Sequence, residues 1–190
     1  MPLLGPRDAL PARPQRVLVA GTSGAGKTTL AAAVGAALAI PQVELDALFH
    51  GPGWTPRPSF AADVARLADG EQWVTEWQYD AARDVLAARA DLLVWLDLPR
   101  RVVLRGLVRR TVGRRLRSRE LWNGNFEPPL RTFLTDPEHI VRWAWTTHSR
   151  TAPRVRALQA RRPELAVVRL RSRREVGRWL TGPLRAVARG

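Results

Sequence analysis

The chain contains no cysteine, which excludes disulfide bonds, thiolate metal sites and cysteine nucleophiles. Its apolar runs are short, and none approaches the ~20 residues that a membrane-spanning helix needs. Residues 1–15 carry four prolines but lack the apolar core of a signal peptide, so we expect a flexible leader there. These absences predict a cytoplasmic protein without a membrane partner.

Lysine and acidic residues are also scarce. Of 31 basic residues, 30 are arginine and one is lysine, whereas aspartate and glutamate together number 17, which gives a formal net charge of +14. This charge indicates an anionic partner, such as a nucleotide, a nucleic acid or a phospholipid surface. Because arginine replaces lysine along the whole chain, the preference is compositional, and charge alone does not choose among these partners. The single lysine, Lys27, therefore stands out.

The pattern of apolar residues predicts the fold class. The 190 residues, 45% of them hydrophobic, suit one domain, which we assign to residues 16–190. Short apolar runs typical of buried strands alternate with segments typical of helices. The predicted strands are 16–20, 42–46, 71–76, 91–98 and 165–170, and the predicted helices are 29–40, 59–68, 80–90, 99–117, 136–149 and 173–180. This alternation predicts an α/β fold in which helices cover both faces of a parallel sheet.

A glycine-rich loop follows the first predicted strand. Its spacing, Gly21-x-x-x-x-Gly26-Lys27-Thr28, is that of the phosphate-binding loop (P-loop, or Walker A motif). Glycines let backbone N–H groups turn towards an anion, and the helix that follows adds the positive end of its dipole. Lys27 would reach the β- and γ-phosphates of a nucleoside triphosphate, and the Thr28 hydroxyl would bind Mg²⁺. The residues predicted to bind the nucleotide are Gly21, Thr22, Ser23, Gly24, Ala25, Gly26, Lys27, Thr28 and Thr29.

Four further motifs follow in order along the chain. They are Val-Glu-Leu-Asp-Ala-Leu-Phe at 43–49, Gly-Trp at 53–54, Trp-Val-Thr-Glu-Trp-Gln-Tyr at 73–79 and Ala-Asp-Leu-Leu-Val-Trp-Leu-Asp-Leu-Pro at 90–99. With the P-loop, this set resembles the adenylate kinase-like proteins often labelled DNA-topology-modulation proteins, over about residues 16–180. The resemblance implies a nucleoside monophosphate kinase fold with a five-stranded parallel sheet, strand order 2-3-1-4-5, and ATP as the phosphoryl donor. Residues 118–135 show no clear periodicity, and we expect this insertion to act as a lid because it is long enough to do so.

Acidic side chains stand at the carboxyl ends of the predicted strands, which is the edge where open parallel sheets bind ligands. A kinase needs a carboxylate near Mg²⁺ and often a second one that orients or deprotonates the acceptor hydroxyl. The resemblance implies that Glu44 and Glu76 serve the metal and that Asp46 serves the acceptor. A turn or a helix cap is the alternative role for each acid. At position 77 the family usually has glycine, whereas this chain has Trp77, so the sequence does not predict the shape of the acceptor pocket.

Residues 99–119 contain nine arginines and no acidic residue. The resemblance implies that Arg105, Arg109 and Arg110 clamp the transferring phosphoryl group, a task that suits the rigid, bidentate guanidinium. One alternative is a solvated helix face. The other is a nucleic-acid surface, which should bind weakly because no aromatic residues alternate with these arginines. The residues that the resemblance implies near the adenine ring are Arg171, Ser172 and Arg173.

The sequence therefore predicts an ATP- and Mg²⁺-dependent kinase that acts on a small acceptor, such as a nucleoside, a nucleotide or a similar compound. The alternative is a nucleotide-dependent switch or a DNA-associated NTPase without a small acceptor. A kinase should turn over with one class of acceptor, whereas a switch should hydrolyse ATP slowly and ignore small molecules.

Overall fold

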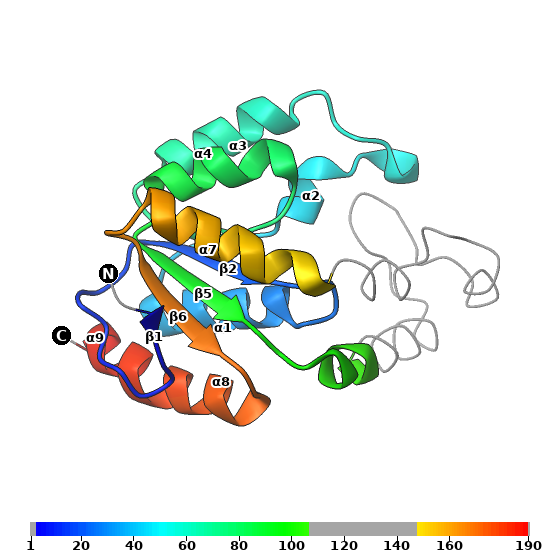
Figure 1. Ribbon diagram of the computed structural model, residues 1–190. Coiled ribbons are helices and arrows are strands. Elements are labelled where there is room, and N and C mark those ends of the chain that lie inside the picture. Colours follow the sequence, from blue (N-terminus) through cyan, green and yellow to red (C-terminus); the bar gives the residue numbers. More distant parts are fainter. Residues whose placement is uncertain (1–2, 107–147, 190) are drawn as a thin grey trace.

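The computed structural model describes residues 3–106 and 148–189. A parallel sheet of six strands forms the centre of this part of the chain (Figure 1). From one edge to the other the strands are β1 (Leu3–Leu4), β6 (Ala166–Leu170), β5 (Leu92–Leu96), β2 (Arg16–Gly21), β4 (Trp73–Glu76) and β3 (Gln42–Val43). The strand that leads into the P-loop, β2, therefore lies in the middle of the sheet, between β5 and β4.

The sheet corrects the prediction of five strands. Its sixth strand, β1, comes from the predicted leader and pairs in parallel with β6 at the edge, with Leu3 opposite Val167. Because the added strand lies at an edge, the other five keep the order β3-β4-β2-β5-β6 within the sheet. Four of the five predicted strands are shorter than predicted, and β3 has only two residues, whereas β2 is one residue longer than predicted.

Helices cover both faces of the sheet (Figure 1). One face carries α1 (Lys27–Leu38), α8 (Arg173–Trp179) and α9 (Arg185–Arg189), with a π-helical segment, η4 (Leu180–Leu184), between the last two. The other face carries α3 (Phe60–Asp69), α4 (Asp80–Arg89) and α7 (Thr151–Arg161). The shorter elements are α2 (Leu45–Phe49), η1 (Pro52–Trp54) and η3 (His148–Arg150), and residues 100–106 are also helical. In the described part of the chain, no helix is both long and apolar enough to cross a membrane.

Side chains of the central strands alternate between two hydrophobic cores, one on each face of the sheet. In β2, Val17 and Val19 pack in the core beneath α1 and α8, and Leu18 and Ala20 pack in the core beneath α3, α4 and α7. All four are fully buried. A strand buried on both faces is typical of parallel sheets, and here it gives the P-loop a rigid base.

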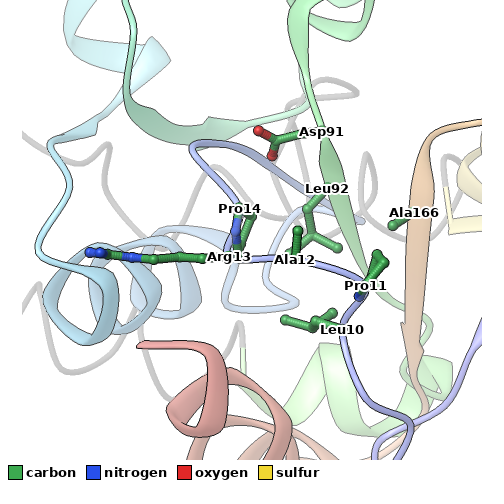
Figure 2. A pocket seen from close by; sticks show the side chains of 8 residues that line it. All are labelled: Leu10, Pro11, Ala12, Arg13, Pro14, Asp91, Leu92 and Ala166. Atoms are coloured by element: carbon green, nitrogen blue, oxygen red, sulfur yellow. The ribbon is translucent and has the colours of Figure 1, made fainter. Parts of the chain in front are cut away.

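The predicted leader packs against the domain. Leu10 is buried in the core, and the Arg13 guanidinium donates a hydrogen bond of 2.6 Å to the Leu38 carbonyl at the end of α1. The Asp91 carboxylate accepts the backbone N–H groups of Gln15, at 3.0 Å, and Arg16, at 3.1 Å. Residues 10–14 thus cross the amino ends of β5 and β6, where they line a hollow of about 120 Å³ (Figure 2). The domain accordingly begins before residue 16.

Two further segments differ from the prediction. The predicted strand 42–46 ends at Val43, and Asp46 lies in the first turn of α2 instead of at a strand end. The structure also contains α7, which the sequence pattern did not predict because Pro153 and three arginines obscure its apolar face. Proline is compatible with the first turn of a helix, and Val155 and Leu158 form the buried face of α7. The predicted lid at 118–135 and nearly all of the predicted helix 136–149 lie outside the described residues.

Candidate active site

The P-loop connects β2, which ends at Gly21, with α1, which begins at Lys27. Gly24 and Gly26 have φ angles of +80° and +94°, a region that residues with a side chain rarely adopt. Ala25 between them is fully buried, and its N–H donates a hydrogen bond of 3.0 Å to the Thr22 carbonyl. The loop is therefore held to the core at Thr22 and Ala25.

The beginning of α1 is suited to an anion. Its N-cap residue, Gly26, has no side chain that could cap the first N–H groups, and the first turn contains no acidic residue. Lys27 lies in the same turn, and its Nζ is 3.5 Å from the Thr22 carbonyl oxygen. Loop amides, a helix N-terminus and a lysine together form the donor set that holds the phosphates of a nucleotide. Ser23 is half-buried, and Thr29 is exposed in α1.

Glu76 lies at the carboxyl end of β4, beside the P-loop strand, and is 2% exposed. Its carboxyl group makes a hydrogen bond with the Thr28 hydroxyl and accepts the backbone N–H of Leu45 at 3.3 Å. Burial raises the pKa of Glu76, the neighbouring Asp46 adds to this rise, and the two hydrogen bonds oppose it. A cation at this position would favour the ionised carboxylate.

Hydroxyl and carboxylate oxygens are ligands that Mg²⁺ accepts, so Thr28 and Glu76 fit the predicted metal site. Among residues 3–106 and 148–189, no group of three or more His, Asp or Glu side chains could hold a metal. A P-loop site does not require such a group, because the nucleotide phosphates supply part of the coordination. Glu44 occupies the N-cap of α2 and is half-buried, one residue before the Leu45 amide that contacts Glu76.

Asp46 lies next to Glu76 and is held by two residues that follow β4. Its Oδ1 accepts hydrogen bonds from the Gln78 amide, at 2.7 Å, and from the Tyr79 hydroxyl, at 2.6 Å. The Tyr79 oxygen is also 3.2 Å from Nε2 of His50. Burial raises the pKa of Tyr79, and the negative charge of Asp46 raises it further. Since both hydrogen bonds go to Oδ1, Oδ2 is the oxygen that could meet an acceptor hydroxyl.

Aromatic side chains surround this polar group, and sequence reasoning missed them. The ring of Phe49 stacks on Tyr79 with centroids 4.2 Å apart, and Trp54 meets His50 edge-on at 5.1 Å. Tyr79 and Trp54 have φ angles of +59° and +61°, and such strained residues cluster at functional sites. The sequence signal was weak, because His50 has no metal-ligand spacing and these residues come from separate segments.

Two other residues of the predicted strand ends have structural contacts. Asp97 accepts a hydrogen bond of 2.8 Å from Nε of Arg169, whose guanidinium lies 4.6 Å from the centre of the Trp95 ring. Trp77 is 6% exposed, packs in the core on the α4 side, and donates a hydrogen bond of 3.2 Å from Nε1 to the Arg83 carbonyl. Its bulk is therefore accommodated in the core.

Of the three arginines predicted to clamp the transferring phosphoryl group, only Arg105 lies within the described residues. Arg105 is exposed at the end of the helical residues 100–106, and the next residue, Gly106, lies against the P-loop. A Cβ built on Gly106 would be 3.4 Å from the Gly24 carbonyl oxygen. Arg109 and Arg110 lie outside the described residues.

The loop after β6 leads into α8. Ser172 caps α8, since its Oγ accepts the Glu175 N–H at 3.2 Å, and the Arg171 N–H donates to the Glu175 carboxylate at 2.7 Å. The spacing Ser172-x-x-Glu175 predicts a capping box from the sequence, and the structure confirms it, although the Arg171 N–H replaces the Ser172 N–H as the donor to Glu175. Arg173, the first residue of α8, reaches back to Gly26 of the P-loop.

The hollow in Figure 2 lies at the other end of the strands. Its lining includes Leu92 and Ala166, the first residues of β5 and β6, whereas the P-loop follows the last residue of β2. The candidate active site is therefore the carboxyl edge, where Thr28, Glu76 and Asp46 meet.

Comparison with known proteins identifies the fold. No protein-family model and no curated protein matches the sequence. Among solved structures, a gluconokinase from Sinorhizobium meliloti is 22% identical, with 94% of each chain covered and a TM-score of 0.50. A sugar kinase from a Janibacter species is 21% identical, with 98% of each chain covered and a TM-score of 0.50. At this identity the likeness concerns the fold, and the chain has the fold of the P-loop kinases.

Proposed function

We propose that this protein is an ATP- and Mg²⁺-dependent kinase that transfers a phosphoryl group to a small acceptor. One observation carries the proposal: a row of polar groups that begins at the P-loop. It runs from the Thr28 hydroxyl to the Glu76 carboxyl, and from there through the Leu45 amide to the neighbouring Asp46. A protein that only binds or hydrolyses ATP does not need a held carboxylate, Asp46, beyond the metal site.

Each group in the row has a role in this proposal. The loop amides and Lys27 hold the phosphates of the donor, and Thr28 and Glu76 are metal ligands, with Glu44 near the water shell of the metal. When bound, Mg²⁺ neutralises charge on the phosphate oxygens. Asp46 orients the acceptor hydroxyl and takes its proton, while Gln78 and Tyr79 fix the orientation of the carboxylate.

Other predicted roles rest on the sequence and on its resemblance to the adenylate kinase-like proteins. Arg105, Arg109 and Arg110 are proposed to stabilise charge on the transferring group, and residues 118–135 are proposed to form a lid. The loop that contains Arg171, Ser172 and Arg173 is proposed to lie near the donor nucleotide. Membership in the family labelled DNA-topology-modulation proteins is likewise a proposal.

The acceptor side favours a compact molecule with hydroxyl groups. Its polar atoms come from Asp46, Gln78 and His50, and its apolar surface comes from Phe49 and Trp54. Aromatic rings next to hydrogen-bonding groups suit a nucleoside, a nucleotide or a sugar-like alcohol. Because two proteins with this fold are named as a gluconokinase and a sugar kinase, sugar acids and sugars belong in the panel of acceptors.

The donor half of the proposal is tested with Lys27→Ala. This variant should keep its thermal unfolding midpoint without nucleotide and should lose tight MgATP binding in isothermal titration calorimetry. Arg156→Ala is the control, since it removes an exposed positive charge on α7 and should bind MgATP unchanged. Lys27→Arg should also bind poorly, because the loop suits a slim point charge. A Lys27→Ala protein that binds MgATP like the parent would exclude this P-loop as the donor site.

The acceptor half is tested by measuring ADP release with panels of nucleosides, nucleoside monophosphates, sugars and sugar acids. A kinase should show faster ADP release with one class and a phosphorylated product by mass spectrometry. If ADP release stays at a slow basal rate with every acceptor but changes with DNA or protein, the nucleotide-dependent switch is the better interpretation.

A further inference from the structure

Arg173 lies where the P-loop turns into α1. A Cβ built on Gly26 would be 2.7 Å from Nη1 of Arg173 and 3.3 Å from Nη2. The same Nη2 is 3.7 Å from a Cβ built on Gly106. The guanidinium therefore occupies the space that a side chain at Gly26 would fill, and it also lies near Gly106, at the end of the helical residues 100–106.

Within the described residues, this guanidinium makes no ion pair or hydrogen bond. Several arginines on the other face of the sheet are paired, for example Arg161 with Asp84 at 3.1 Å. The acid nearest to Arg173 in the sequence, Glu175, accepts the Arg171 N–H instead. Since the first turn of α1 has no acidic residue either, a positive charge is held at the P-loop without a negative partner.

We infer that Arg173 binds the α- and β-phosphates of the donor nucleotide, an inference that rests on the proposed ATP site. The amides around Gly26 are the part of a P-loop that cradles these phosphates, whereas the loop lysine reaches towards the γ-phosphate. A guanidinium at Gly26 can offer two parallel N–H donors to phosphate oxygens. The capping box of Ser172 and Glu175 fixes the start of α8 and hence the direction in which Arg173 leaves the helix.

This position has a consequence for specificity. The sequence resemblance places residues 171–173 near the adenine ring, but the contact with Gly26 assigns the side chain of Arg173 to the phosphates. Arg173 therefore contributes to the binding of ATP and ADP by the same factor and contributes nothing to the binding of adenosine. Arginines that act on the transferring phosphoryl group would instead favour ATP over ADP.

The test compares Arg173→Ala with Arg174→Ala, its exposed neighbour in α8, by calorimetric titration of ATP, ADP and adenosine with Mg²⁺. Loss of a charge-assisted hydrogen bond should weaken ATP and ADP binding about ten- to a hundredfold, and by the same factor for both. Adenosine binding should not change, and Arg174→Ala should bind all three like the parent. Arg173→Lys, which keeps the charge but not the paired donors, should lie between the parent and Arg173→Ala.

Four results would overturn the inference. They are unchanged ATP and ADP affinity in Arg173→Ala, an equal loss for adenosine, a loss confined to ATP, and a lower thermal unfolding midpoint of Arg173→Ala without nucleotide. The last would show that the guanidinium supports the loop structure, whereas a charge without a partner should leave the midpoint unchanged or raise it on removal. Failure of the proposed function would look different, because the parent protein itself would not bind MgATP.

Discussion

Tyr79 combines backbone strain with the contacts that hold Asp46. A φ of +59° at a residue with a large side chain costs on the order of 1–3 kcal/mol, so the surrounding contacts must offset it. They are the ring stack on Phe49 and the hydrogen bond to Asp46. These contacts hold both the ring of Tyr79 and the orientation of its hydroxyl group.

Tyr79→Phe separates these two contributions. The ring stack stays, but Asp46 loses one of its two hydrogen bonds, so the free energy of unfolding should fall by about 1 kcal/mol. Turnover of the acceptor should fall as well, because the carboxylate is less firmly oriented, while MgATP affinity should hold. Urea unfolding and steady-state kinetics measure the two effects. Unchanged stability and turnover together would remove Tyr79 from the proposed site.

Asp46→Asn tests the proposed base directly. The amide cannot accept the proton of the hydroxyl, so kcat should fall about a hundred- to ten-thousandfold. MgATP binding should persist, because the donor contacts lie at the P-loop and Glu76. Asp84→Asn is the control, since Asp84 is exposed on α4 and pairs with Arg161. Equal turnover of Asp46→Asn and the parent would exclude Asp46 as the base.

At the scale of elements, the beginnings of α1 and α8 are complementary. α1 starts at a glycine with no capping side chain, which leaves its N-terminus suited to a ligand, whereas α8 starts at Ser172, whose Oγ accepts the Glu175 N–H. Through Arg173, α8 places a positive charge at the uncapped start of α1.

Ser172→Ala should therefore have two effects. Loss of the N-cap should lower the free energy of unfolding by about 1 kcal/mol. Because α8 carries Arg173, the affinity for ADP should also fall. Thr181→Ala removes a hydroxyl that donates to the Gly177 carbonyl within the same helical stretch, and it should change both quantities less. If the two variants behave alike in chemical unfolding and ADP titration, the capping box has no special part in positioning Arg173.

For the whole molecule, the net charge of +14 is unevenly compensated. Most arginines around α3, α4 and α7 are paired, as Arg66 is with Asp63, Arg89 with Asp69 and Arg161 with Asp84. In the described part of α8 and α9, by contrast, Arg174, Arg178 and Arg185 are exposed and take part in no ion pair. Within the described residues, the face of the sheet covered by α8 and α9 therefore carries uncompensated positive charge.

This charge predicts weak nucleic-acid binding without sequence preference. Fluorescence anisotropy with duplex DNA should show a complex at low salt that is lost by ~200 mM, since binding through phosphates alone depends steeply on salt. Duplexes of different sequence should bind alike. A complex that persists at this salt concentration and prefers one sequence would favour the DNA-associated alternative.

Local features of the protein were determined by the sequence alone. The P-loop could be predicted because its function depends on residues next to one another, and the capping box of α8 spans four residues. The alternation of strands and helices indicated the α/β fold, because burial of parallel strands on both faces leaves a pattern in each segment. The metal candidate Thr28 followed from the P-loop motif, and the candidates Glu44 and Glu76 followed from the resemblance to the adenylate kinase-like proteins.

The remaining features were decided by the tertiary structure, because they depend on contacts between distant segments. The pairing of β1 with β6 joins segments that lie far apart in the sequence. No local pattern shows that Leu3–Leu4 form a strand and not part of a flexible leader. Asp46 is oriented by Tyr79 from another segment, and Arg173 meets Gly26 only after α8 has packed beside the P-loop. Sequence patterns indicate which faces of a helix or strand are buried, but not which distant segments pack against them. Hydrophobic burial is non-directional, so the packing of the folded chain selects the partner.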